Sequence, residues 1–130
     1  MVTNETITEP TVVDIRAEAL ANDVFRRVIR TGAHEQVVLM TLHEGESIGA
    51  EVHETTDQLF VFVDGAGEAR VGGESIAVED GDLVFVEAGT RHDIVNVGST
   101  PLRLLTVYAP PAHAPGTVHR SKAEAEAAEH

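Results

Sequence analysis

The chain has 130 residues, a formal net charge of −13 and no cysteine. This length fits a single domain that buries a hydrophobic core and needs no disulfide bonds for stability. The acidity argues against nucleic acids and anionic membranes as partners, and the absence of cysteine excludes disulfides and thiolate metal sites. The sequence contains neither an apolar run of membrane-spanning length nor a basic segment followed by a short apolar one. We therefore expect a cytoplasmic protein.

Residues 1–23 are expected to form an N-terminal arm. The first eleven residues are polar and include Pro10, which favours a mobile or loosely docked segment. Residues 12–21 fit neither the helical nor the strand period cleanly, although Asp14 is a possible helix N-cap. The sequence leaves a short strand and a turn of helix as alternatives for this stretch.

A β pattern begins at Val24. Residues 24–30 and 36–42 are apolar-rich and flank a turn that contains Gly32, which predicts a hairpin, and residues 47–53 are expected to form the next strand. Short apolar segments then alternate with glycine turns, which predicts strands at 58–63, 68–71, 75–78, 82–86, 93–97 and 102–108. Many short strands without a helix-length periodic segment between them indicate an all-β sandwich or barrel.

Residues 109–130 are expected to form a C-terminal loop and a short helix. The stretch 109–116 contains three prolines and cannot be regular structure. Ser121 and Glu124 have the spacing of a capping box ahead of an alanine-rich run. We expect the resulting helix to dock weakly or to lie on the surface.

Four side chains in the β segments are of types that bind metals. Glu51 and His53 are two residues apart, so they leave the same face of a strand. Gln58 opens the following strand, from which its carbonyl oxygen can reach the same point, and His92 supplies a fourth ligand. Buried ionisable groups are costly unless they are paired or metal-bound, which favours a metal site over incidental buried polar residues.

The other polar candidates have weaker support. Asp57 is a rival of Gln58 but faces the opposite side of its strand. His113 and His119 lie in a tail that can fold over the barrel, and His119 is the better candidate of the two. Arg70 and Arg91 are possible anion binders, although alternation turns Arg91 away from the site. The remaining histidines are expected to be exposed: His34, His43 and His130.

The two stretches that carry these ligands resemble the paired motifs of the cupin family. The first motif of that family contains His-x-His followed by a Glu. In this sequence Glu51 stands at the first His, His53 matches the second and Gln58 stands at the Glu. The carboxylate has moved from the third ligand position to the first, so the charge delivered to a dication is unchanged.

The second motif matches at most of its defining positions. Gly81, Gly89, His92 and Asn96 fit it, and Glu87 replaces the proline. The resemblance implies that residues 24–108 form a double-stranded β-helix, the jelly-roll barrel of cupins, and that Asn96 makes structural hydrogen bonds. It also implies a homodimer, formed through a sheet face or an exchanged N-terminal strand.

The proposed ligand set is Glu51, His53, Gln58 and His92, and it suits one divalent transition metal per chain: Zn, Mn, Fe, Co or Ni. The first hypothesis is a metal-dependent enzyme of isomerase, lyase or hydrolase type that acts on a small polar carboxylate or sugar-like substrate. No residue is identified as its general base.

Two alternatives remain open. Counting only Glu51, His53 and His92, the set is two histidines and one carboxylate, which is the ligand set of non-haem Fe(II) dioxygenases. The other alternative is a cupin that binds a small molecule without turnover, because fold alone does not establish function.

Overall fold

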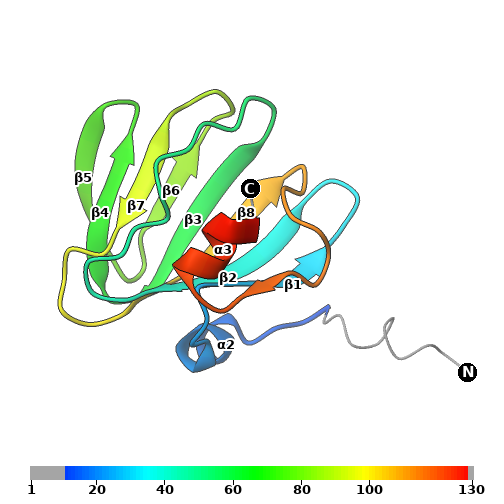
Figure 1. The fold of residues 1–130 in the computed structure, drawn as a ribbon, viewed down its shortest axis with the longest axis horizontal. Helices are drawn as coiled ribbons and strands as arrows, with labels where there is room; N and C mark the ends of the chain where they lie inside the picture. The colour runs from blue at the N-terminus through cyan, green and yellow to red at the C-terminus, as the bar shows by residue number, and fades with distance from the viewer. Residues whose placement is uncertain (1–10, 129–130) are drawn as a thin grey trace, which may run out of the picture.

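Residues 11–128 are described by a computed structural model of the chain, drawn in Figure 1. The first ten residues of the expected arm and His130 lie outside the described residues. Two antiparallel sheets make up the body of the molecule, with strand orders β6-β3-β8-β2-β1-β9 and β5-β4-β7. This arrangement confirms the predicted all-β jelly roll with a short C-terminal helix.

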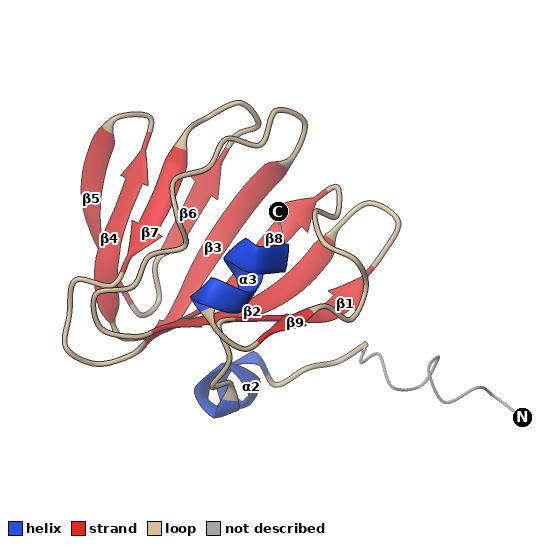
Figure 2. Cartoon of the chain, viewed as in Figure 1, coloured by secondary structure: helices blue, strands red, loops and turns tan. Residues whose placement is uncertain are grey.

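Most of the strands lie close to their predicted positions. In chain order the elements are α2 (Ile15–Ala21), β1 (Arg26–Thr31), β2 (Gln36–Leu42), β3 (Asp57–Asp64), β4 (Ala66–Val71), β5 (Glu74–Glu79), β6 (Leu83–Val86), β7 (His92–Val95), β8 (Leu102–Ala109), β9 (Val118–His119) and α3 (Lys122–Ala128). Figure 2 separates the strands from the two helices, which lie outside the sheets. No helix among the described residues has the length and apolar character needed to cross a membrane.

The core lies between the sheets and follows the two-residue period of the strands. In β8 buried and half-buried residues alternate along the strand, and β3 begins with the same alternation. Phe60, Phe62, Leu102 and Leu104 are each at most 1% exposed. Burying a side chain of this size stabilises the fold by about 1.5–3 kcal/mol.

The stretch that the sequence left open forms helix α2. Asp14 is its N-cap, with the Oδ1 atom accepting a hydrogen bond from the backbone N–H of Ala17 at 3.1 Å. Ala19 is 1% exposed and belongs to a small cluster with Leu39 and Val63. The cap and one buried alanine therefore settle the choice in favour of a helix.

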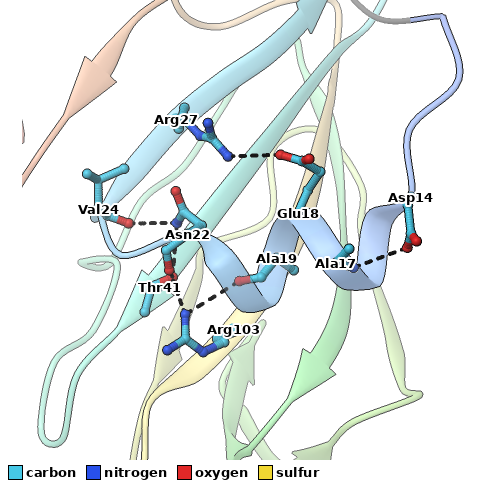
Figure 3. Close-up of polar contacts among 9 residues, drawn as sticks. All are labelled: Asp14, Ala17, Glu18, Ala19, Asn22, Val24, Arg27, Thr41 and Arg103. Atoms are coloured by element: carbon cyan, nitrogen blue, oxygen red, sulfur yellow. Dashed lines mark hydrogen bonds and ion pairs between the residues drawn. The ribbon is translucent and has the colours of Figure 1, made fainter.

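Behind α2 a buried polar network ties the helix to the larger sheet (Figure 3). Asn22 donates through Nδ2 to the carbonyl of Val24 at 2.8 Å and to Thr41 Oγ1 at 2.9 Å. Arg103 donates to the carbonyl of Asn22 at 2.6 Å and to that of Ala19 at 3.5 Å. Thr41 Oγ1 also donates to the Asn22 carbonyl at 2.8 Å, so the groups of this network have partners.

The expected strand over residues 47–53 is wrong. This stretch makes only two isolated bridges to β7, Ser47 with Val95 and Glu51 with His92. Gly49 lies between them with φ of 95°, a left-handed conformation that interrupts a strand. The segment therefore meets β7 at two points instead of forming a continuous ladder.

The C-terminal segment is more ordered than expected. Val118 and His119 form β9 and pair with β1 at the edge of the larger sheet. Ser121 Oγ accepts from the backbone N–H of Glu124 at 3.1 Å, and the Glu124 carboxylate accepts from the N–H of Arg120 at 2.8 Å. Ala125 of α3 is 2% exposed and joins the main core, while most other residues of the helix are exposed, so α3 lies on the surface and docks through one buried alanine.

Candidate metal centre

Three predicted ligands meet where the 47–53 segment crosses β7. Glu51 and His92 pair through two backbone hydrogen bonds of 2.9 Å. The Glu51 Oε1 and His53 Nε2 atoms are 3.5 Å apart. One ligand atom from each of Glu51, His53 and His92 lies within 4.8 Å of the other two. The bridge thus brings together residues that are 41 positions apart in the sequence.

The orientation of His92 follows from its backbone neighbour. Nδ1 of His92 lies 3.0 Å from the carbonyl oxygen of Thr90, which can only accept a hydrogen bond. Nδ1 therefore carries a proton, and in the neutral ring the lone pair lies on Nε2. His92 is 2% exposed, so this lone pair points into the protein.

The fourth predicted ligand faces that lone pair. The Thr106 hydroxyl donates to the carbonyl of Leu59 at 2.9 Å and accepts from Nε2 of Gln58 at 2.9 Å. The amide nitrogen of Gln58 is thereby directed at Thr106, and its Oε1 lies 3.1 Å from Nε2 of His92. Two acceptor atoms that face each other in a buried place require a proton or a cation between them.

The spacing of these atoms fits a bound metal. Two ligand atoms, each about 2.1 Å from one ion, lie about 3 Å apart in octahedral and about 3.4 Å apart in tetrahedral geometry. The His92–Gln58 separation of 3.1 Å and the Glu51–His53 separation of 3.5 Å lie near this range. The donor set of two imidazoles, one carboxylate and one amide oxygen suits a divalent transition metal.

Glu51 is ionised at neutral pH. Burial acts to raise the pKa of its carboxyl group, but the hydrogen bond and charge of His53, with the charges of Arg26 and His92, outweigh it. The pKa of Glu51 is therefore lowered from its usual value of 4.5. A carboxylate in this state is ready to bind a cation.

Aromatic side chains close the centre on its other side. The ring of Tyr108 lies edge-on to that of His53, with centroids 5.9 Å apart, and His113 lies edge-on to Tyr108 at 5.1 Å. Burial raises the pKa of Tyr108 to about 12, so its hydroxyl stays protonated. Burial, together with the charge of Arg26, lowers the pKa of His113 to about 4, so its imidazole is neutral at pH 7.

The tail brings His119 beside the same centre. Arg26 pairs with His119 across β1 and β9, and its Nη1 lies 3.1 Å from Nδ1 of His119. A guanidinium only donates, so Nδ1 of His119 accepts and the proton of the neutral ring lies on Nε2. The sequence left open whether the tail reaches the site; in the structure His119 lines a cavity together with Glu51 and His53.

Two cavities adjoin the centre, and Glu51 lines both. One, of about 360 Å³, is also lined by His53, His113, Thr117 and His119. The other, of about 500 Å³, lies between β1, the loop 48–51 and α3, and Arg26 and Lys122 line it. Both fall within the size range of small-molecule sites.

Several residues considered from the sequence lie elsewhere. Asp57 is exposed and accepts from the N–H of Ala88 at 2.9 Å. Arg70 is exposed and pairs with Glu68 at 2.7 Å. Asn96 is 1% exposed and makes three hydrogen bonds to backbone groups, as expected for a structural residue. Arg91, His34 and His43 are exposed.

Sequence reasoning missed Arg26 and Tyr108. Arg26 lies on the inner face of β1, on the same side as the buried Val28. Tyr108 is the last buried residue of β8. A charged residue at an inward position of a strand was the available signal for Arg26. The pairing of β1 with β9, which gives that arginine its histidine partner, has no counterpart in the local sequence pattern.

The chain is similar to proteins from several organisms. It is 42% identical over 127 residues to the uncharacterized protein YrkC of Bacillus subtilis, covering 93% of this chain and 68% of that protein. The crystal structure of BH2720 from Bacillus halodurans superposes with a TM-score of 0.89 at 41% identity, covering 91% of this chain and 94% of that one. An oxalate-binding protein of Thermotoga maritima is 32% identical over 68 residues, 52% of this chain and 56% of that protein.

The model of the Cupin domain family matches residues 38–108, which is the span that contains both ligand motifs and all four candidate ligands. Together with the jelly roll and the near-complete coverage of BH2720, this match assigns the family. The chain therefore belongs to the Cupin domain family.

Proposed function

We propose that this cupin binds one divalent transition metal per chain through Glu51, His53, His92 and Gln58, and that it is an enzyme for small polar carboxylates. The opposed acceptor atoms of His92 and Gln58, 3.1 Å apart, carry the proposal. Without a metal these two atoms need a proton between them, and a bound cation can take the place of that proton.

When bound, the metal supplies Lewis-acid chemistry: it polarises a carbonyl or hydroxyl oxygen or activates water. The residues of the chain have separate tasks. Tyr108 is buried against His53 and keeps water from that side of the centre. His119, in the cavity shared with Glu51 and His53, offers its Nε2–H to an oxygen atom of the substrate. These features support an isomerase, lyase or hydrolase reaction.

Two observations support a carboxylate as the substrate class. The Thermotoga relative is named an oxalate-binding protein. In addition, the centre of this chain lies beside the buried guanidinium of Arg26. Either feature favours an anionic substrate over a neutral sugar.

Metal content tests the proposal directly. The protein is purified without chelator or metal-affinity resin, and its metals are measured together with those of His53→Ala and His92→Ala. We expect about one transition metal per wild-type chain and a loss in both variants. Wild-type protein that stays empty after incubation with Zn, Mn and Fe(II) would contradict the proposal and favour a cupin that binds a ligand without a metal.

The dioxygenase alternative has one observation of its own. One ligand atom from each of Glu51, His53 and His92 lies within 4.8 Å of the other two, and this set without Gln58 resembles the two-histidine, one-carboxylate triad. It predicts oxygen consumption that depends on Fe(II) and reductant, with Zn-loaded protein inert. Substrate turnover by the Zn-loaded form excludes this alternative.

The homodimer remains a prediction, as does the absence of nucleic acid and membrane partners. Apolar side chains of β5 and β6 are more than half exposed and line one cavity of about 440 Å³: Ile76, Leu83 and Phe85. Contact between two copies through this surface would bury them. Light scattering that shows a monomer at working concentration would contradict the dimer.

A further inference from the structure

We infer that Arg26, with Lys122 beside it, forms an anion subsite next to the metal centre, which holds the carboxylate of a small monocarboxylic acid. The inference rests on the proposed function and names how the ligand is recognised. The subsite lies in the cavity of about 500 Å³ between β1, the loop 48–51 and α3.

Arg26 is buried without an ion-pair partner. It is 2% exposed, and no carboxylate oxygen of residues 11–128 lies within 4.0 Å of its guanidinium. Its Nε–H is buried and has no acceptor among the described residues. Its guanidinium contacts Nδ1 of His119, forms a hydrogen bond with Tyr108, and lies over the ring of Phe25 with Cζ 5.3 Å from the ring centroid.

A charge in that position is costly for folding. Removing a guanidinium from water is unfavourable unless an opposite charge compensates it, and the imidazole of His119 and the hydroxyl of Tyr108 carry no negative charge. Glu51 is the acidic group that acts on Arg26 from nearby, and a metal at the centre would neutralise it. A second anion, supplied by the ligand, gives Arg26 the missing partner.

The cavity beside Arg26 has the features of a small-acid site. Lys122 of α3 lines it and is held by a hydrogen bond from Nζ to Ser47 Oγ of 3.0 Å. Ile48 and Ala125 supply apolar wall. Glu126 also lines the cavity and is exposed, so a second negative charge on the ligand would meet a like charge there.

The geometry of the cationic group favours a carboxylate. A guanidinium presents a planar fork of N–H donors that matches two carboxylate oxygens, whereas it offers no acceptor to an amine or ammonium. Glu51 forms the wall between the cavity and the metal centre. A 2-oxo or 2-hydroxy acid held by Arg26 would therefore have its second oxygen on the side of the metal.

Ligand binding to charged and neutral analogues tests the subsite. Calorimetry with Zn-loaded protein measures the affinity for pyruvate and lactate and for their amides, which keep the second oxygen but lack the charge. We expect the acids to bind the wild type at least tenfold more tightly than the amides. Arg26→Gln should remove most of that difference, and Lys122→Gln should reduce it about threefold.

The matched control is Arg27→Gln. Arg27 is the next residue of β1, faces the other side and pairs with Glu18 at 3.3 Å, so its loss removes the same charge without changing the cavity. This variant should keep the wild-type preference for acids. Arg26→Lys, which keeps the charge but not the fork, covers the case in which Arg26→Gln does not fold and should lose part of the preference.

Metal content, measured in the same samples, separates the two proposals. The subsite is contradicted, and the metal centre is not, if metal-loaded Arg26→Gln keeps the wild-type preference for acids. If that variant does not fold, the same result in Arg26→Lys has this meaning. Wild-type protein without any preference for acids would overturn the subsite as well. If the wild type binds no metal, the proposed function fails, and the same titrations on metal-free protein then decide the subsite.

Discussion

Two arginines of the larger sheet, the half-buried Arg103 and the buried Arg26, have opposite surroundings. Arg103 donates to the carbonyls of Ala19 and Asn22 and holds α2 on the barrel (Figure 3). Arg26 is more deeply buried, has a neutral imidazole as partner and keeps one N–H without an acceptor. The half-buried arginine with acceptors for its donors fixes a helix, whereas the buried one without an anionic partner marks a place that a ligand completes.

The polar clusters to which these arginines are close differ in the same way: one has all its hydrogen bonds formed, and the other does not. Around Asn22 and Thr41, donors and acceptors alternate, so the network stabilises the protein as it stands. At His92 and Gln58 two acceptors oppose each other. We therefore expect substitutions around Asn22 and Thr41 to lower the stability of the protein without affecting metal binding. Substitutions at His92 and Gln58 should weaken metal binding with little loss of stability in the metal-free protein.

The largest effect is expected from His92→Ala on stabilisation by metal. At a free metal concentration 1,000 times the dissociation constant, binding stabilises a folded protein by about 4 kcal/mol. For a domain of this size that corresponds to a rise in Tm of roughly 10–20 °C on adding Zn. The rise should vanish in His92→Ala, as measured by thermal unfolding with and without Zn. An equal rise in the variant would place the bound metal elsewhere.

Arg103→Met is expected to have the next largest effect. It removes charge-assisted hydrogen bonds to two carbonyl groups at the end of α2, and such bonds contribute about 1.5–3 kcal/mol. The free energy of unfolding, measured in urea, should fall by about that amount. The metal content should match the wild type, and a variant that also lost its metal would contradict the separation of the two clusters.

The sequence predicted the four candidate ligands, the jelly roll and most strands, because glycine turns and apolar alternation are local signals. It did not predict β9, since Val118 and His119 form a strand only through pairing with β1. It also missed Arg26, whose burial and partner depend on that pairing. The 47–53 segment was expected as a strand, but the positive φ of Gly49 breaks it into two bridges.

Gln58→Leu tests the contrast between the two clusters, because it should weaken metal binding while leaving the stability of the metal-free protein nearly unchanged. Removing Oε1 removes the acceptor that requires a proton or a cation beside His92 Nε2, so the metal-free protein should lose little stability despite the lost bond to Thr106. Metal affinity should fall about 10- to 100-fold, as for lost groups at other metal centres. Competition with a chelating dye measures the affinity. Loss of stability with unchanged affinity would make Gln58 a structural residue like Asn22.

The smallest effect concerns acid stability and depends on His113. Its pKa of about 4 in the folded protein lies below the ordinary value of 6.5. As the pH falls from about 6.5 to 4, the unfolded chain takes up a proton at this residue and the folded chain does not, so stability is lost over that window. His113→Phe keeps a ring against Tyr108 and removes the titration.

Metal-free His113→Phe should therefore lose less stability between pH 7 and pH 5 than the wild type, as measured by urea unfolding at both values. Glu51 contributes with the same sign, since its pKa is also lowered, but its effect sets in below its usual value of 4.5. The interval above pH 5 thus isolates the histidine. Equal losses in the two proteins would mean that the tail opens and hydrates His113 at neutral pH, and the cavity next to Glu51 would then be formed only when a ligand binds.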